Sequence, residues 1–302
     1  MIKLSINNKS SFKTIESSIK NLNKIELNDF FESFLKKHNE LNNKFQFNES
    51  INHNYIFNQL KEIKSAKALS FIPFGIKDIF NTEILPTSMG SEIWQGFMTG
   101  NNARVVSDIV YNGGLIFSKT STAEFAVHFI SPDKTLNPHN PEHITGTSSS
   151  GSAVAVACGA LPICLGTQTA GSIIRPASYC GVYGFKPSFG AIDRTGVLKT
   201  NDTFDTIGFL GSDIYGIKKS FKSLYQKGSD YPNSIKFTDN YKKNKLKTRI
   251  GLLGKKMNFL SKFKDYVNND FSDFIDLEKN NLSFSYINNI NFLNDIHFIH
   301  ET

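Results

Sequence analysis

Cysteine is scarce in this chain of 302 residues, which has only Cys158, Cys164 and Cys180. No two of them form a Cys-x-x-Cys pair, and each lies in an apolar or glycine-rich run. An odd number of cysteines without metal-ligand spacing predicts buried free thiols in a reducing compartment, in place of a disulfide framework or a zinc site.

Long apolar runs are missing as well. Nowhere do 18 apolar residues follow one another, and the first residues, MIKLSINNKSSF, contain no apolar run long enough for a signal peptide. We therefore expect a soluble cytoplasmic protein without membrane contact, provided that the chain begins at its true start.

Positive charge is in excess, with a formal net charge of +7. Such an excess is compatible with an acidic partner such as nucleic acid or a membrane surface. The lysines are scattered, however, and the densest cluster, KKNKLK at residues 242–247, is short. Lys, Asn, Ile and Phe are over-used together, which is typical of a genome-wide compositional bias. We expect a solvated surface there and predict no nucleic-acid binding.

Three zones of different composition follow one another. Residues 1–66 are rich in Asn and Lys, and apolar residues such as Phe31 and Leu35 recur at helical spacing, which predicts two or three helices packing on the outside of a core. Residues 67–302 form the second predicted part. Its central stretch, 70–212, is rich in Gly, Ala, Ser and Thr, whereas 213–302 returns to the Asn- and Lys-rich composition.

Short apolar runs alternate with helix-like stretches in the central zone. We predict helices over 103–111 and 152–158, the first ended by a glycine pair and the second built from small residues that let it approach a sheet closely. Predicted strands cover 115–118, 161–166, 181–185 and, further on, 248–253. This alternation predicts an α/β sheet covered on both faces by helices.

The segment 146–153, GTSSSGSA, combines hydroxyl groups and backbone N–H donors directly before a predicted helix. The spacing Gly146-x-x-x-x-Gly151 fits the start of a phosphate-binding Walker A motif, but Ser152 stands where that motif needs lysine. A flexible surface linker is a second alternative, and the helix and strand that follow directly argue against it.

The segment 166–177, GTQTAGSIIRPA, follows a predicted strand and places Ser172 at a tight turn. A serine there can present its hydroxyl beside free backbone N–H groups, which suit an oxyanion that forms when a carbonyl is attacked. The turn is not the Gly-x-Ser-x-Gly elbow, because Ala170 and Ile174 occupy the glycine positions. No His–Asp pair is evident, and all seven histidines are predicted to be surface or loop residues: His38, His53, His128, His139, His143, His297 and His300.

A base is still needed, because a serine hydroxyl is a poor nucleophile near neutral pH. The best candidate is Lys77, which lies within the apolar stretch FIPFGIKDIF. Burial disfavours the ammonium form and would lower the pKa of this lysine until it can act as a base. Taken alone, Lys77 also fits an ordinary lysine with a buried stem.

Together these segments resemble the amidase signature family. That family carries a G-x-K-D strand, a G-G-S-S-x-G-S-A loop and a G-T-x-x-x-G-S-I turn, which correspond here to residues 75–78, 146–153 and 166–173. The resemblance is dense over residues 72–211 and weaker outside them. It implies a mixed β-sheet core covered by α-helices on both faces, and makes 67–302 an amidase signature domain whose catalytic core is 70–212 and whose C-terminal part, 213–302, is incomplete.

The resemblance also implies roles for individual residues. Lys77 falls on the catalytic lysine, Ser172 on the nucleophile, and Ser148 on the bridging serine, which in the family is held by a cis peptide bond. Neutral Lys77 would take up a proton through Ser148 while Ser172 attacks an amide carbon, and no metal or organic cofactor is implied. The implied oxyanion hole consists of the backbone N–H groups of Thr169, Ala170, Gly171 and Ser172.

This sequence departs from the family pattern in three ways. Thr147 replaces a glycine in the serine loop, and Gln168 stands where many members have aspartate. The family domain usually continues well beyond residue 302, and the last residues, HFIHET (297–302), resemble the beginning of a mid-domain helix. We therefore expect a truncated member with an exposed sheet edge.

Three functions remain open at this point. The first is an amidase acting on a small-molecule carboxamide. The second is the A subunit of a tRNA-dependent amidotransferase, which would release ammonia from glutamine for a partner subunit. The third is a catalytically silent member with at most a binding role.

Overall fold

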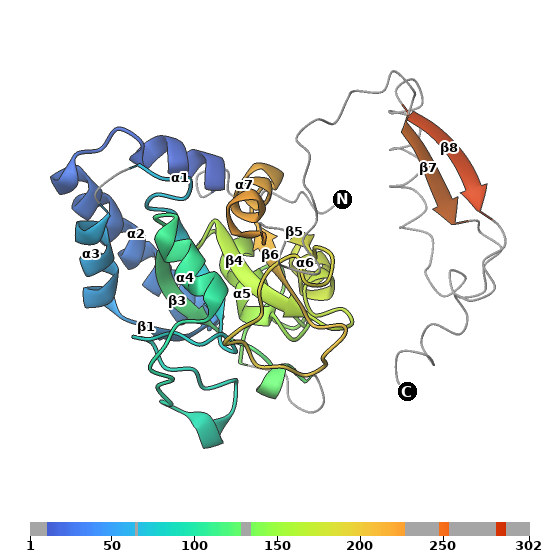
Figure 1. Cartoon of the computed structure of the whole chain (residues 1–302), viewed down its shortest axis with the longest axis horizontal. Helices are drawn as coiled ribbons and strands as arrows, with labels where there is room; N and C mark the ends of the chain where they lie inside the picture. The colour runs from blue at the N-terminus through green and yellow to red at the C-terminus, as the bar shows by residue number, and fades with distance from the viewer. Residues whose placement is uncertain (1–10, 64–65, 128–133, 227–247, 254–281, 288–302) are drawn as a thin grey trace. The chain divides into compact units, whose positions relative to one another are not determined.

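The computed structural model describes residues 11–63, 66–127, 134–226, 248–253 and 282–287 (Figure 1). The chain divides into two compact units, Met1–Lys236 and Phe237–Thr302. In the second unit the described residues are two parallel strands, β7 (Thr248–Leu253) and β8 (Leu282–Ile287). Two sequence segments discussed above, KKNKLK and HFIHET, lie outside the described residues.

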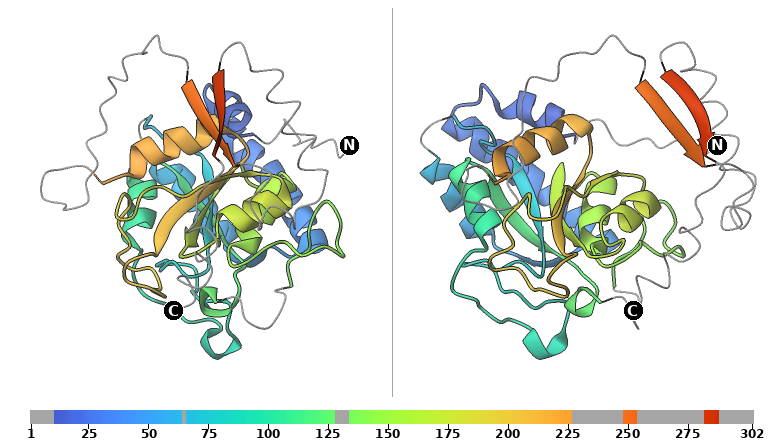
Figure 2. Two further views of the ribbon diagram at one scale, coloured as in Figure 1. Left: turned by 90° about the vertical axis from the view of Figure 1, so that its right-hand side faces the viewer. Right: turned by 45° about the vertical axis from the view of Figure 1, so that its right-hand side comes forward.

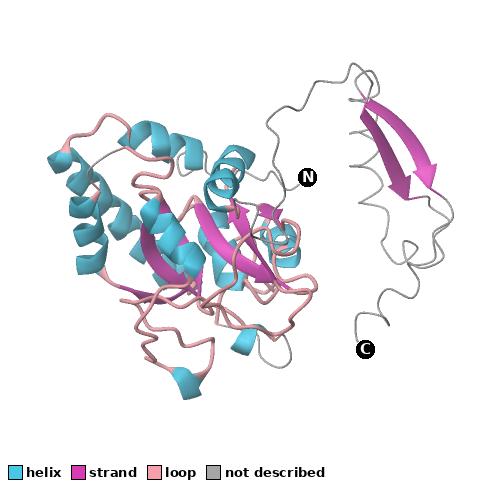
Figure 3. Ribbon diagram, viewed as in Figure 1, coloured by secondary structure: helices cyan, strands magenta, loops and turns pink. Residues whose placement is uncertain are grey.

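The first unit is built on a mixed sheet, whose strands are magenta in Figure 3. The sheet has six strands in the order β1-β3-β2-β4-β6-β5. Its three central strands are parallel: β2 (Pro73–Lys77), β3 (Leu115–Thr120) and β4 (Ile163–Gln168). The outer strands run antiparallel to their inner neighbours: β1 (Asn48–Ile51), β5 (Tyr183–Phe185) and β6 (Thr206–Gly211). The predicted mixed sheet is confirmed.

Helices cover both faces of this sheet. In the edge-on view of Figure 2, α4 (Arg104–Tyr111) and α7 (Ile214–Leu224) lie on one face, whereas α5 (Ser150–Ala157) and α6 (Ile174–Cys180) lie on the other. The N-terminal part supplies α1 (Phe12–Ile19), α2 (Lys24–Phe45) and α3 (His53–Glu62), and two short 3-10 turns are η2 (Glu92–Trp94) and η3 (Glu124–Ala126).

Most predicted elements are found close to their expected bounds. The helix over 103–111 is α4 with Ala103 as its N-cap, and the strand over 248–253 is β7. The strand expected from residue 181 begins two residues later, because Gly181 adopts the left-handed conformation (φ 66°) that ends α6. Strand β1 was not predicted, since its sequence NESI shows no alternation of apolar and polar residues.

Close packing fixes the central strand β2. A Cβ atom on Gly75 would lie 2.5 Å from Cys164 Sγ on β4, so no larger residue fits there. Strand β2 is buried along its whole length and ends at Lys77. Since the carboxyl ends of parallel strands meet at one edge of a sheet, Lys77 lies at the edge where such folds place their ligands.

The three cysteines are free thiols, as predicted, with Cys164 and Cys180 buried and Cys158 half-buried. Burial raises the pKa of Cys158 to about 12, so this thiol stays protonated near neutral pH. No helix in the described ranges combines the length and apolarity needed to cross a membrane.

The prediction of a surface or loop position is wrong for His38. This residue lies in α2 and is fully buried, with its ring edge-on to Phe47 and Phe117. Its Nδ1 atom lies 3.4 Å from the Ala160 carbonyl oxygen and its Nε2 atom 2.6 Å from Asn48 Nδ2, which suits a neutral ring protonated on Nδ1. Burial lowers the pKa of His38 to about 4.

We expect His38 to make the folded state sensitive to acid. Its folded pKa of about 4 lies below the ordinary value of 6.5, so the stabilisation is complete above pH 6.5 and is lost as the pH falls toward 4. At about pH 5 the free energy of unfolding should be lower by roughly 2 kcal/mol than at about pH 7.5. Urea unfolding at both pH values measures this difference. A His38→Phe variant, which keeps an aromatic ring, should lose that part of the pH dependence; an unchanged slope would contradict the assignment.

Candidate active site

Lys77 is fully buried at the end of β2, where its Nζ atom has two hydroxyl partners. Nζ lies 2.7 Å from Ser148 Oγ and 2.8 Å from Thr167 Oγ1. Burial lowers the pKa of Lys77 to about 7, while the negative charge of Asp205 opposes this change. A neutral amine is therefore accessible near neutral pH and can accept a proton from a hydroxyl.

Ser148 lies in the loop before α5, and its side chain is fully buried. The Thr147–Ser148 peptide bond is cis, as the family resemblance implied. Gly146, at φ 77°, brings this loop against α6, since a Cβ atom there would lie 2.9 Å from Pro176 Cα. Ser149 joins the loop to β4, because its Oγ atom lies 3.3 Å from the Thr167 carbonyl oxygen.

Ser172 lies in the turn between β4 and α6 and is half-buried. Its carbonyl oxygen accepts a hydrogen bond from the Ser149 N–H at 3.3 Å, so its turn is joined to the serine loop. Among the described residues its hydroxyl has no hydrogen-bond partner, unlike that of the buried Ser148. The structure thus brings Lys77 and Ser148 into direct contact, and it joins Ser172 to them through the backbone of Ser149.

Gln168, which replaces the aspartate of many family members, shapes this turn. Its Nε2 atom donates to the Ala170 carbonyl oxygen at 2.8 Å. Its Oε1 atom accepts from the N–H groups of Ile173 and Ile174, both at 2.9 Å, and so caps the start of α6. The amide group of Gln168 thus supplies both a donor and an acceptor to the turn.

Four consecutive backbone N–H groups of this turn have no acceptor among the residues that the structure describes. Within the described ranges, none of the N–H groups of the predicted oxyanion hole donates a backbone or side-chain hydrogen bond: Thr169, Ala170, Gly171 and Ser172. Unpaired N–H groups beside a half-exposed serine hydroxyl can bind a developing oxyanion.

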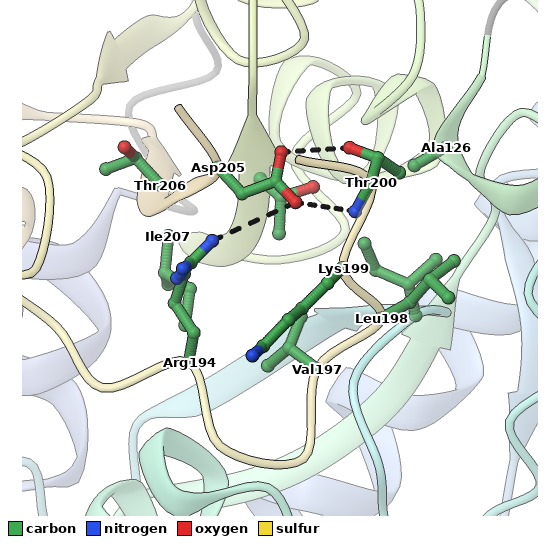
Figure 4. Close-up of a pocket in the computed structure, with 11 residues that line it drawn as sticks. Ala126, Arg194, Val197, Leu198, Lys199, Thr200, Asp205, Thr206 and Ile207 are labelled. Atoms are coloured by element: carbon green, nitrogen blue, oxygen red, sulfur yellow. Dashed lines mark hydrogen bonds and ion pairs between the residues drawn. The ribbon is translucent and has the colours of Figure 1, made fainter. Parts of the chain in front are cut away.

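A small cavity adjoins Thr167, the second partner of Lys77. Its walls come from the segment 194–207 together with Ile79, Ala126 and Thr167. Asp205 lies in this wall and accepts hydrogen bonds from Thr200 (Figure 4). Sequence reasoning assigned no role to Thr167 or Asp205, although both lie within segments that match the family.

A second buried lysine was also missed. Lys119 on β3 forms an ion pair with Asp78 at 2.9 Å, and both side chains are fully buried. Its Nζ atom also lies 2.9 Å from the Phe80 carbonyl oxygen and 2.8 Å from Thr87 Oγ1, so it ties the segment after β2 to the sheet. Burial lowers the pKa of Lys119 and raises that of Asp78, and their attraction opposes both changes.

No metal site accompanies these groups in the part of the chain that the structure describes. There, His, Cys, Asp and Glu side chains do not gather in groups of three or more that could hold an ion.

Comparison with known proteins gives matches of family and of fold. The family model described as Amidase matches residues 29–281. The A subunit of a glutamyl-tRNA(Gln) amidotransferase from Clostridium botulinum (strain Hall) is 35% identical over 219 residues, which are 68% of this chain and 42% of that protein. The chain therefore spans less than half the length of this curated relative.

Many solved structures share the fold, and two of them illustrate the match. The A subunit of the glutamyl-tRNA(Gln) amidotransferase from Thermotoga maritima superposes with a TM-score of 0.77 at 21% identity, covering 93% of this chain and 62% of that one. The native peptide amidase from Stenotrophomonas maltophilia gives a TM-score of 0.76 at 22% identity, covering 94% and 62%.

Proposed function

The chain belongs to the amidase family, and we propose that it hydrolyses the C–N bond of a carboxamide through an acyl-enzyme on Ser172. The observation that carries this proposal is the 2.7 Å contact between Lys77 Nζ and Ser148 Oγ at a fully buried position. Within the described ranges Lys77 forms no ion pair with a carboxylate. Its two hydroxyl partners and its pKa of about 7 suit it to proton transfer.

In the first step, Ser172 Oγ attacks the amide carbon and its proton passes to Ser148, whose own proton passes to neutral Lys77. The carbonyl oxygen becomes an oxyanion, which the free N–H groups of residues 169–172 bind. The tetrahedral intermediate then collapses, the C–N bond breaks, and the relay returns a proton to the leaving nitrogen, which departs as ammonia or an amine. Water attacks the Ser172 ester by the same relay and releases a carboxylic acid.

This mechanism predicts how activity depends on pH. Because Lys77 must be neutral and its pKa is about 7, kcat/KM should fall roughly tenfold per pH unit well below that value and level off above it. A pH–rate profile from about pH 5.5 to about pH 9 measures this fall of kcat/KM on the acid side, the acid limb of the profile. A profile that stays flat across the range would contradict a lysine base.

The same chemistry serves a second candidate, the glutaminase subunit of an amidotransferase, which the match to the Clostridium botulinum protein favours. Release of ammonia from glutamine, compared with release from a panel of simple aliphatic and aromatic carboxamides, distinguishes the two. Co-purification of a partner subunit together with glutamine hydrolysis would support the second candidate. A folded chain that hydrolyses none of these amides would contradict both and support a catalytically silent protein.

A further inference from the structure

The carboxylate of Asp205, one residue before β6, is almost fully enclosed by donors. Its Oδ2 atom accepts the backbone N–H groups of Thr200 at 2.7 Å and Asn201 at 2.9 Å. Its Oδ1 atom accepts the hydroxyl groups of Thr200, at 2.9 Å, and of Thr169. Although burial raises the pKa of Asp205, these hydrogen bonds hold it below its ordinary value, so the group is an anion near neutral pH.

Thr169 is the residue through which this network reaches the active site. It is the first of the four residues whose backbone N–H groups have no acceptor among the described residues. Its hydroxyl donates to Asp205, and its Oγ1 atom lies 3.0 Å from Thr200 Oγ1. Gln168, the residue before Thr169, donates to the Ala170 carbonyl oxygen and accepts from the Ile173 N–H at the far end of the turn. The turn is therefore held from two sides, and Asp205 supplies the only charged group among these contacts.

We propose that Asp205 is a positioning residue of the amidase site, which holds the oxyanion-binding turn through Thr169 and supplies the negative charge that acts on Lys77. This inference rests on the proposed function and adds to it a residue outside the Ser–Ser–Lys relay. An oxyanion hole works only when its donors are fixed before the charge develops, which makes the anchor of the turn important for rate.

The charges around Lys77 predict the direction in which its pKa changes when Asp205 is neutralised. Its direct partners, Ser148 and Thr167, are neutral, and the neighbouring Asp78 is paired with Lys119. Asp205 is the charge that raises the pKa of Lys77 against the effect of burial. Three cations lie nearby: Arg194 is 4.0 Å from Asp205 Oδ2, Lys199 lies in the same cavity wall, and the Arg175 guanidinium lies beside Gly171 of the turn. Neutralising Asp205 should therefore lower the pKa of Lys77 and move the acid limb of the rate profile toward lower pH.

The test uses the rate at which a fluorophosphonate labels Ser172, measured against pH on the full chain, so that no substrate need be known. Asp205→Asn should slow labelling on the alkaline plateau by about 10- to 100-fold and shift its acid limb to lower pH. Thr169→Val removes the anchor but keeps the charge, so it should slow labelling without moving the limb. Thr169→Ser keeps the hydroxyl and should restore most of the wild-type rate.

The outcomes distinguish a failure of the role proposed for Asp205 from a failure of the proposed function. A cooperatively folded Asp205→Asn chain that labels at the wild-type rate with an unmoved limb would overturn this inference and leave the proposed function intact. Slow labelling by Thr169→Ser and Thr169→Val alike, with no shift for Asp205→Asn, would overturn it too. A folded wild-type chain that takes no label would contradict the proposed function itself, and the inference would fall with it.

Discussion

Replacement of Ser172 by alanine is expected to lower amide hydrolysis by about 10⁴-fold or more, because the proposed nucleophile is removed. The same change should leave the free energy of unfolding almost unaltered. The Ser172 side chain is half-buried, and its hydroxyl has no hydrogen-bond partner among the described residues, so alanine removes no stabilising contact.

Ser178→Ala is the matched control, because this exposed serine lies in α6, the helix that follows the Ser172 turn. It should keep both full activity and full stability. Steady-state hydrolysis of a carboxamide and urea unfolding of the three proteins measure both quantities. Hydrolysis by Ser172→Ala at even a tenth of the wild-type rate would show that another group is the nucleophile.

The two buried lysines are expected to lose stability to very different extents when each is replaced by methionine. Lys119 faces the Asp78 carboxylate and further acceptors, so Lys119→Met leaves a buried carboxylate without its partner. Breaking a buried ion pair on one side costs about 3–5 kcal/mol of the free energy of unfolding. The stability of the whole domain should fall by that amount.

Lys77 has only hydroxyl partners among the described residues, and its pKa of about 7 lets it lose its charge. Lys77→Met should therefore cost only the two hydrogen bonds, roughly 1–2 kcal/mol, while abolishing hydrolysis. Urea unfolding at about pH 8, where Lys77 is neutral, compares the two variants directly. Equal losses of stability, or a larger loss for Lys77→Met, would refute the distinction between a neutral lysine and a paired one.

These two lysines also show why the sequence predicts one part of the site better than the other. Both follow short apolar runs, FGIK and LIFSK, so local sequence does not distinguish them. Lys77 stands out because the family resemblance assigns it the role of the catalytic lysine, whereas it assigns no role to Lys119. The partner of Lys119 lies 41 residues earlier in the chain, and only the parallel pairing of β2 with β3 brings the two residues together.

The surface position predicted for His38 was wrong, although the spacing of neighbouring apolar residues indicates burial. Phe31, Leu35 and His38 are spaced as i, i+4 and i+7, and they share the buried face of α2. The periodicity therefore predicted burial, whereas residue type argued for the surface. Strand β1 lacked any such signal, because it adds to the sheet edge through backbone pairing with β3 and not through an apolar pattern.

The serine loop was correctly placed directly before a helix and the turn directly after a strand, because glycines and small residues mark both. The hydrogen-bond network that holds the turn was not predicted from the sequence. Asp205 and Thr169 are separated by a long stretch of chain, and they meet because β4 and β6 pair antiparallel with Gln168 opposite Thr206. Contacts of this kind depend on strand register, which no local pattern encodes.

The most direct test of the account is covalent labelling of the 302-residue chain by a serine-directed fluorophosphonate, read by intact mass and peptide mapping. A single adduct on Ser172, absent from Ser172→Ala and lost on Lys77→Met, is the predicted result, since only a hydroxyl activated by the relay reacts readily. A cooperatively folded chain that takes no adduct, or an adduct on another serine, would contradict the assignment of Ser172 as the nucleophile.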